Sequence, residues 1–155
     1  MAVRNNVTRL LDSRGIQYQA LEFSPGIKSA AGVAEALGLP LEQVFKTLVV
    51  LGEKGRPLLV VITGSAELDL KRLARAVGEK KLRMATHREA EDLTGLQVGG
   101  ISPLALLNRG FDIYLDELVQ VFDTVCISAG QRGVNIVLPV EALLQLTGAT
   151  LIDLG

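Results

Sequence analysis

One lysine lies in a segment that otherwise predicts a buried strand. The run 44–51 is apolar apart from Lys46 and Thr47, and an ammonium group is costly to bury unless its head reaches water or a partner. In one interpretation the Lys46 side chain extends past a strand edge into solvent. In the other, it points into a cleft and meets an anionic or carbonyl oxygen of a substrate. Thr47 would face the other side of an ideal strand, so we expect the two to share a pocket only if the strand bends or bulges.

A second segment places two glycines and a proline around a small polar residue. It comprises Gly99, Gly100, Ile101, Ser102 and Pro103. A tight turn at the end of a strand would account for this composition. Alternatively, the bare backbone N–H groups of the loop face a substrate carbonyl and stabilise the negative charge that develops during acyl transfer.

A third segment has a glycine-flanked arginine between two predicted strands. Ser128 and Asn135 bracket Arg132 there. The simpler interpretation is a hairpin loop with a solvated arginine. In the functional one, the strand ends present a hydroxyl and an amide group to a substrate hydroxyl or amine.

Side chains that act as strong nucleophiles or as soft metal ligands are scarce in this sequence. The chain has one cysteine, Cys126, and one histidine, His87, which excludes an internal disulfide and leaves too few soft ligands for a zinc site. A Cys–His nucleophile pair would require these two residues to meet. We instead expect Cys126 to be a small buried residue of its strand and His87 to be exposed, and we expect no metal or cofactor.

Charge is balanced overall and uneven locally. The formal net charge is -1, but residues 71–88 carry a net +6 and residues 110–155 a net -5. The basic segment is either a solvated helix with its following turn or a docking surface for a polyanion, whose binding would weaken steeply with salt. Its basic residues are Lys71, Arg72, Arg75, Lys80, Lys81, Arg83 and Arg88.

The length of 155 residues predicts one domain with a sizeable core. The apolar runs are far shorter than the roughly 18 residues needed to span a bilayer, so we expect no membrane crossing. The N-terminus lacks the basic and then apolar pattern of a secretory signal. A cytoplasmic location is therefore expected.

Capping residues and hydrophobic periodicity predict short helices alternating with strands. Helices are expected after caps at Asn5 or Asn6, Ser29, Asp69 and Thr86, and from near Pro139. Strands are expected over residues 16–23, 44–51, 58–63, 111–115, 124–128, 134–138 and 149–154, with a hairpin turn at 53–55. Because several strands are joined by hairpins and the helices are short, the pattern favours an α+β domain with a mixed or antiparallel sheet.

Taken together and in this order, residues 44–48, 98–104 and 128–136 resemble the YbaK family of aminoacyl-tRNA deacylases, which is related to the editing domain of bacterial prolyl-tRNA synthetases. The resemblance extends over nearly the whole chain as a single domain, residues 1–155. It implies an α+β fold with a mixed, largely antiparallel, barrel-like sheet and short surrounding helices. The cleft of such a domain accepts the aminoacylated 3′ adenosine of a tRNA.

The resemblance also implies residue roles. Lys46 would be the most important side chain, and the loop from Gly99 to Pro103 would surround the aminoacyl group. Thr47, Ser128, Asn135 and Phe23 would line the site. Asn135 stands where the family usually has an aspartate, and Phe23 stands where relatives can carry a tyrosine.

The glycine loop most resembles the branch that deacylates Cys-tRNA(Pro), which implies trans editing. In the mechanism implied, the substrate's own cysteine thiol attacks the ester carbonyl and releases a cyclic thioester and free tRNA, with prolyl-tRNA synthetase as an expected partner. Three alternatives remain open. They are an Ala-tRNA(Pro) hydrolase that uses water, a noncatalytic module that binds tRNA or a synthetase, and a small-molecule or nucleotide hydrolase that uses the same cleft.

Overall fold

The computed structural model describes residues 3–53 and 56–154. The α-helices there are α1 (Asn6–Ser13), α2 (Ala30–Leu37), α3 (Leu70–Val77), α4 (His87–Thr94) and α5 (Val140–Thr147). The strands are β1 (Gln19–Glu22), β2 (Phe45–Gly52), β3 (Pro57–Thr63), β4 (Leu82–Met84), β5 (Asp112–Asp116), β6 (Thr124–Gln131), β7 (Val134–Pro139) and β8 (Thr150–Ile152). Three short 3-10 turns connect them, namely η1 (Leu41–Gln43), η2 (Pro103–Ala105) and η3 (Glu117–Val121).

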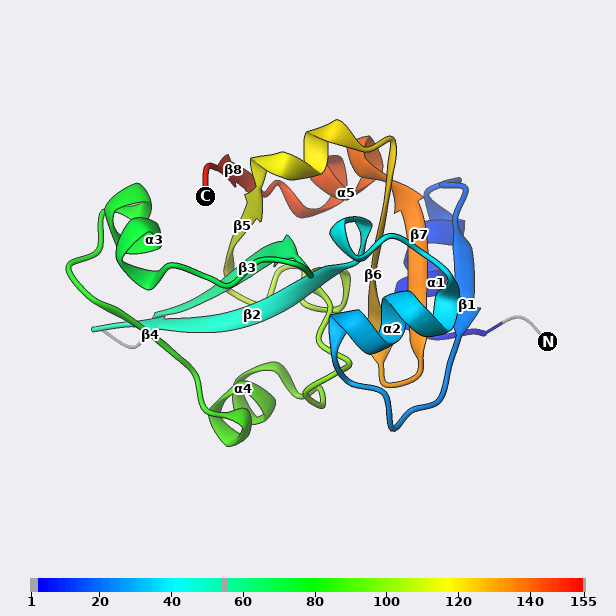
Figure 1. The fold of residues 1–155 in the computed structure, drawn as a ribbon, viewed down its shortest axis with the longest axis horizontal. Coiled ribbons are helices and arrows are strands. Elements are labelled where there is room, and N and C mark those ends of the chain that lie inside the picture. The colour runs from blue at the N-terminus through cyan, green and yellow to red at the C-terminus, as the bar shows by residue number, and fades with distance from the viewer. Residues whose placement is uncertain (1–2, 54–55, 155) are drawn as a thin grey trace.

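The strands form two sheets. One has the order β1-β7-β6 and is antiparallel, and the other has the order β4-β2-β3-β5-β8, in which β3–β5 and β5–β8 are parallel. A single parallel bridge between Val44 and Cys126 connects them. The predicted α+β class with a mixed sheet and short helices is confirmed, but the sheet divides in two and does not close into a barrel (Figure 1).

Local sequence signals account for the helix boundaries. Asn5, Ser29, Asp69 and Thr86 each accept a hydrogen bond from a backbone N–H of the first turn that follows, as the capping patterns predict. The strand prediction differs in detail: β1 begins at Gln19 instead of residue 16, β6 extends to Gln131, and the short β4 was not predicted. The predicted hairpin turn includes residues 54 and 55, which lie outside the described residues.

The main core lies between the two sheets. Phe45, Val61 and Leu115 of the larger sheet pack with the inward residues of β6 and β7, and α1 and α5 contribute to the same cluster. α3 covers the other face of the larger sheet, while α2 packs on Val44 and Cys126, where the sheets meet. No helix among the described residues is long and apolar enough to cross a membrane.

Asp116 is a buried carboxylate at the end of β5. Its Oδ1 accepts a hydrogen bond of 3.1 Å from the backbone N–H of Leu118. Burial raises the pKa of Asp116 above its ordinary value, the Leu118 hydrogen bond lowers it, and the Asp153 carboxylate raises it further. Because the pKa is higher in the folded state than in the unfolded state, the free energy of unfolding falls as pH rises through the interval between the two values.

Asp116→Asn keeps an acceptor for Leu118 and cannot ionise. We expect the variant to be more stable than the parent at pH 7, with an advantage that shrinks as pH is lowered and is lost below about pH 4, where the parent carboxyl is protonated in both states. Urea unfolding at several pH values measures this, with the exposed Asp123→Asn as the control. An advantage that does not vary with pH would contradict the assignment.

Candidate active site

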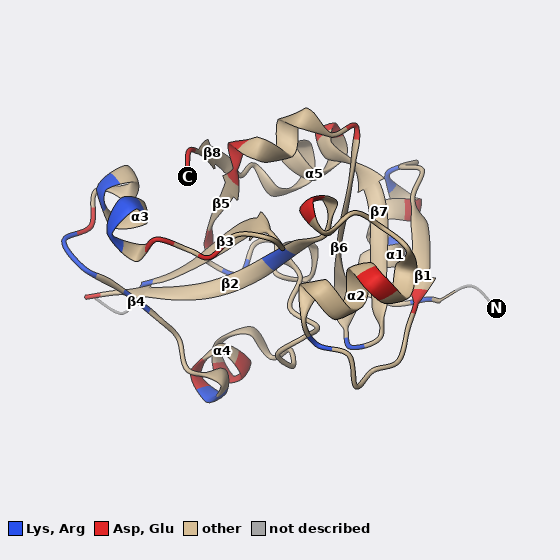
Figure 2. Cartoon of the chain, viewed as in Figure 1, with Lys and Arg blue, Asp and Glu red and all other residues tan. Residues whose placement is uncertain are grey.

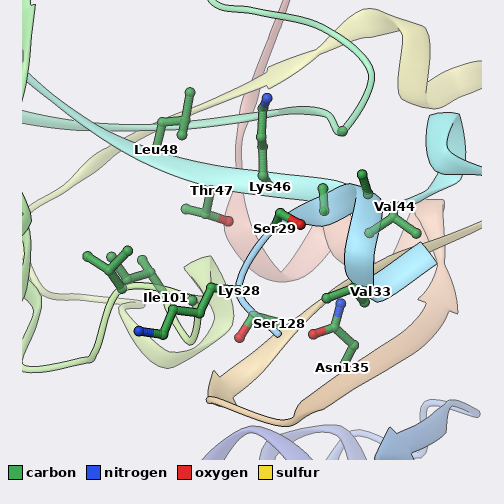
Figure 3. Close-up of a pocket in the computed structure, with 15 residues that line it drawn as sticks. Lys28, Ser29, Val33, Val44, Lys46, Thr47, Leu48, Ile101, Ser128 and Asn135 are labelled. Atoms are coloured by element: carbon green, nitrogen blue, oxygen red, sulfur yellow. The ribbon is translucent and has the colours of Figure 1, made fainter. Parts of the chain in front are cut away.

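A cleft of about 370 Å³ brings together residues from distant parts of the chain. This volume falls within the range of small-ligand sites. Its walls come from the start of β2, the start of α2, the glycine loop and the β6–β7 hairpin (Figure 3). The residues that line it are Lys28, Ser29, Ala30, Ala31, Val33, Val44, Lys46, Thr47, Leu48, Gly64, Val98, Gly99, Ile101, Ser128 and Asn135.

Lys46 and Thr47 both border this cleft from a regular strand. β2 pairs with β3 from Phe45 to Leu51 without a register shift, and Figure 3 shows Lys46 on one side of β2 and Thr47 on the other, toward Ser128. β4 pairs with the edge of β2 opposite β3, and only at residues 50–52. The cleft borders the part of this edge that β4 does not cover. The two residues therefore border one cleft without a bulge in β2, one of the two distortions that the prediction allows for.

Ser128 and Asn135 form the polar wall opposite Thr47. They face each other directly across β6 and β7, which places their side chains on the same face of the sheet. The Ser128 Oγ accepts a hydrogen bond from the Gly130 N–H at 3.2 Å. The Asn135 Nδ2 donates to the Cys126 Sγ at 3.4 Å, and its oxygen lies on the Ser128 side (Figure 3). The wall thus offers a hydroxyl and an amide oxygen to a bound group.

Cys126 is the buried residue that holds the Asn135 side chain of this wall through the hydrogen bond to its Sγ. It is 0% exposed, and burial raises the pKa of its thiol while the Asn135 hydrogen bond lowers it, with burial the larger effect. His87 is exposed at the start of α4. The two residues therefore do not form a nucleophile pair, and Cys126 is the buried strand residue that the sequence predicts.

The glycine loop contributes part of its length to the cleft. Gly99 and Ile101 line it, whereas Gly100, Ser102 and Pro103 are buried and are not among the lining residues. The Gly100 N–H donates to the Gln97 carbonyl at 2.8 Å, and the Ser102 Oγ accepts from the Leu104 N–H at 3.2 Å. The Gly100 N–H and the Ser102 Oγ thus make hydrogen bonds within this segment, which stabilise the conformation of the loop.

Comparisons with known proteins bear on what this cleft does. Residues 24–146 match the aminoacyl-tRNA editing domain. The chain is 41% identical over 146 residues to EbsC of Enterococcus faecalis, a proposed Cys-tRNA(Pro)/Cys-tRNA(Cys) deacylase, covering 93% of this chain and 88% of EbsC. The chain belongs to the aminoacyl-tRNA editing domain family. The family and the deacylase class predicted from the three motifs are thereby confirmed.

Two further relatives carry a similar domain, one within a longer synthetase and the other as nearly the whole of its chain. A proline–tRNA ligase of Thermodesulfovibrio yellowstonii is 36% identical over 94 residues, which cover 61% of this chain and 16% of the ligase. A crystal structure of a proposed trans-editing enzyme for prolyl-tRNA synthetase superposes with a TM-score of 0.83 at 32% identity, covering 99% of this chain and 98% of that one.

Phe23 does not line the cleft of this editing domain. Its side chain packs against the cluster that contains Val33, Val44 and Cys126, and its N–H donates to the Gly133 carbonyl at 3.0 Å. Phe23 therefore packs beneath the cleft, in the cluster that joins α2 to Val44 and Cys126. Its role in contacting substrate stays a prediction.

Lys28 is a charged cleft residue that the sequence did not reveal. It lies exposed in the turn before α2, beside Ser29, whose Oγ accepts a hydrogen bond from the Gly32 N–H at 3.0 Å. An isolated lysine in a turn has no periodic pattern around it, so no local signal identifies it. Lys28 and Lys46 both line the editing domain's cleft, and Figure 3 shows them on opposite sides of β2.

The described residues that line the cleft include no aspartate, glutamate, histidine or cysteine. Its hydroxyl groups belong to Ser29, Thr47 and Ser128, and a hydroxyl is a weak nucleophile without an adjacent general base. The editing domain is thus equipped to bind and orient a substrate and to stabilise negative charge.

The predicted basic patch lies at the other end of β2, around α3 and β4 (Figure 2). Three of its members have carboxylate partners: Arg72 with Asp153 at 2.7 Å, Arg83 with Glu89 at 2.7 Å, and Arg88 with Asp92 at 3.9 Å. Among the described residues, no ion pair involves the other four, which are Lys71, Arg75, Lys80 and Lys81. These four form the uncompensated part of the patch.

Proposed function

We propose that this protein is a trans-editing deacylase that removes cysteine from mischarged tRNA(Pro). The observation that carries the proposal is the composition of the cleft. It has two lysines, a glycine loop and a polar wall, and none of its described lining residues is an aspartate, glutamate, histidine or cysteine. The 41% identity to EbsC supports the same substrate class.

In this proposal the aminoacyl ester lies between the glycine loop and the polar wall. The Ser128 hydroxyl and the Asn135 amide oxygen accept from the substrate's α-amino group or terminal ribose, and Thr47 faces them from β2. Lys28 holds a phosphate or the ester carbonyl oxygen, since an ammonium group favours negative charge nearby. Lys46, which Figure 3 shows on the side of β2 away from Ser128, reaches the same oxygen by rotating around the edge of β2 that β4 leaves uncovered. The Gly99 and Ile101 backbone orients the ester.

The reaction then needs no nucleophile from the protein. The substrate's thiol sulfur attacks its own ester carbonyl carbon, a C–S bond forms, and the C–O bond to the terminal ribose breaks. The thiol proton ends on the ribose hydroxyl, so the products are a cyclic thioester and free tRNA. The protein contributes orientation, which can supply a large part of the barrier reduction, and stabilisation of the charge on the carbonyl oxygen.

Deacylation of Cys-tRNA(Pro), Ala-tRNA(Pro), Ser-tRNA(Pro) and Pro-tRNA(Pro) under reducing conditions tests this function. Selective loss of the cysteinyl ester is expected, and Ser-tRNA(Pro) is the matched control because a hydroxyl replaces the thiol. Selective loss of the alanyl ester would instead support the alternative of hydrolysis by water. Turnover of free aminoacyl esters without tRNA would favour a small-molecule hydrolase.

The basic patch is proposed to bind the tRNA backbone outside the cleft. β2 extends from the cleft to the patch, and its eight residues span about 25 Å at roughly 3.3 Å per residue. A tRNA acceptor end could therefore reach the cleft while its phosphates contact Lys71, Arg75, Lys80 and Lys81. A noncatalytic tRNA-binding module would use the same surface.

Reversing the charge of Lys80 and Lys81 together is expected to weaken tRNA binding by about tenfold or more at low salt. It should also reduce the slope of log K against log salt by about 2, because each lost phosphate contact removes about 0.9. Titration of uncharged tRNA at several salt concentrations measures both. The exposed Arg9 of α1 and the exposed Arg14, which directly follows α1, provide a matched double reversal at the other end of the molecule, and an equal effect there would argue against a localised patch.

Location and docking are proposed on the same basis. A trans-editing enzyme acts where tRNA is aminoacylated, so a cytoplasmic location follows. Prolyl-tRNA synthetase is the proposed partner, since relatives of this domain occur within proline–tRNA ligases. Co-sedimentation of the protein with the synthetase, with and without tRNA(Pro), tests this contact.

A further inference from the structure

The glycine loop is tied to two other elements through the residue before it. The Val98 carbonyl accepts a hydrogen bond from the Arg132 Nε at 2.8 Å, and the Val98 N–H donates to the Glu91 Oε2 at 2.8 Å. The same Glu91 oxygen lies 3.9 Å from the Arg132 Nη2. Both backbone groups of Val98 are therefore held by charged side chains, one from α4 and one from the β6–β7 turn.

The hydrogen bonds that Arg132 and Glu91 make to Val98 are stronger than the ion pair that they make with each other. The Arg132 and Glu91 side chains are 27% and 40% exposed, and their charged atoms are 3.9 Å apart. A partly exposed pair at that separation contributes little to global stability. The two hydrogen bonds to Val98 are short and charge-assisted, which makes them the stronger interactions.

The loop also packs backbone to backbone on the same turn. A Cβ at Gly100 would lie 2.8 Å from the Arg132 N and from the Gln131 carbonyl carbon. Gly99 adopts a φ of +94°, and a Cβ there would lie 3.7 Å from the Arg132 Cγ. The turn that carries Arg132 joins the strands that carry Ser128 and Asn135, so these contacts set the distance between the loop and the polar wall.

We propose that Arg132 and Glu91 are positioning residues that fix the glycine loop at the spacing from Ser128 and Asn135 that the reaction requires. The proposal rests on the deacylase function above. Neither residue lines the cleft, so both act through Val98. Their loss therefore affects the placement of the ester in the transition state more than its affinity.

The variants Glu91→Ala, Glu91→Gln and Arg132→Lys test the proposal, with Asp92→Ala as the control. Asp92 is the next residue of α4 and is exposed. Glu91→Ala and Arg132→Lys are expected to lower kcat by about 10- to 100-fold with little change in KM, because a displacement of about 1 Å at the reacting group can have an effect of that size. Glu91→Gln keeps an acceptor for Val98 and should retain most of the activity.

Hydrogen exchange of the Val98 amide provides a readout that does not depend on activity. Faster exchange in Glu91→Ala, with Glu91→Gln and Asp92→Ala resembling the parent, supports the positioning role. Full activity in Arg132→Lys, or a loss confined to KM and salt dependence, would overturn it, since Arg132 would then act as a charge alone. If the parent deacylates no substrate, the proposed function fails, and the exchange measurement alone decides the role of the cluster.

Discussion

Lys46→Ala is expected to lower the single-turnover rate of deacylation by about 100- to 1000-fold, the usual effect of removing one donor that stabilises developing charge. Lys46 is half-buried where the cleft borders the edge of β2, and the described residues that line the cleft include no carboxylate that would neutralise it. Quenched-flow deacylation of Cys-tRNA(Pro) at saturating enzyme measures the rate. The melting temperature should change little, because Lys46 is not part of a core cluster.

Two further substitutions at this position separate charge from packing. Lys46→Met keeps the unbranched apolar stem of the side chain but removes the ammonium group, so it should be as slow as the alanine variant. Lys46→Arg keeps the charge and should recover part of the rate. Near-parental deacylation by Lys46→Met would show that the charge plays no part in the reaction.

Much of the fold could be predicted because its signals are local. The capping box at the start of α4 forms as its sequence predicts, with the Thr86 Oγ1 accepting from the Glu89 N–H and the Glu89 Oε1 accepting from the Thr86 N–H. Glu89 also binds Arg83, and chiefly through this bond its pKa is lowered to about 2. The cap could be read from a four-residue pattern, whereas the ion pair with Arg83 depends on where β4 lies.

The parts of the site that could not be predicted depend on contacts between distant segments. Lys46, Ser128 and Asn135 were predictable because a polar residue in an apolar strand is costly unless it has a partner. Lys28 reaches the cleft only because the turn before α2 packs beside Gly99. The sharing of one cleft by Lys46 and Thr47 likewise depends on how short β4 is, since three residues of β4 leave the rest of the β2 edge without a strand partner.

Gly100→Ala is the second large expected effect. A Cβ at this position would approach three backbone atoms of Gln131 and Arg132 at 2.8 to 3.0 Å, and backbone atoms cannot move aside as a flexible side chain can. The φ of Gly100 is not in the left-handed region, so the substitution adds this contact without backbone strain. The loop is expected to shift away from the polar wall, lowering kcat by about 100-fold through misplacement of the ester.

Gly26→Ala is the matched control, because its φ is also ordinary and its added Cβ would meet only the Ser24 Oγ, at 3.8 Å. Its rate should equal that of the parent. Gly100→Ala should remain folded, since a loop displacement leaves the core between the two sheets intact, and circular dichroism checks this. If Gly100→Ala deacylates Cys-tRNA(Pro) at the parental rate while folded, the close contact between loop and hairpin does not set the geometry of the reaction.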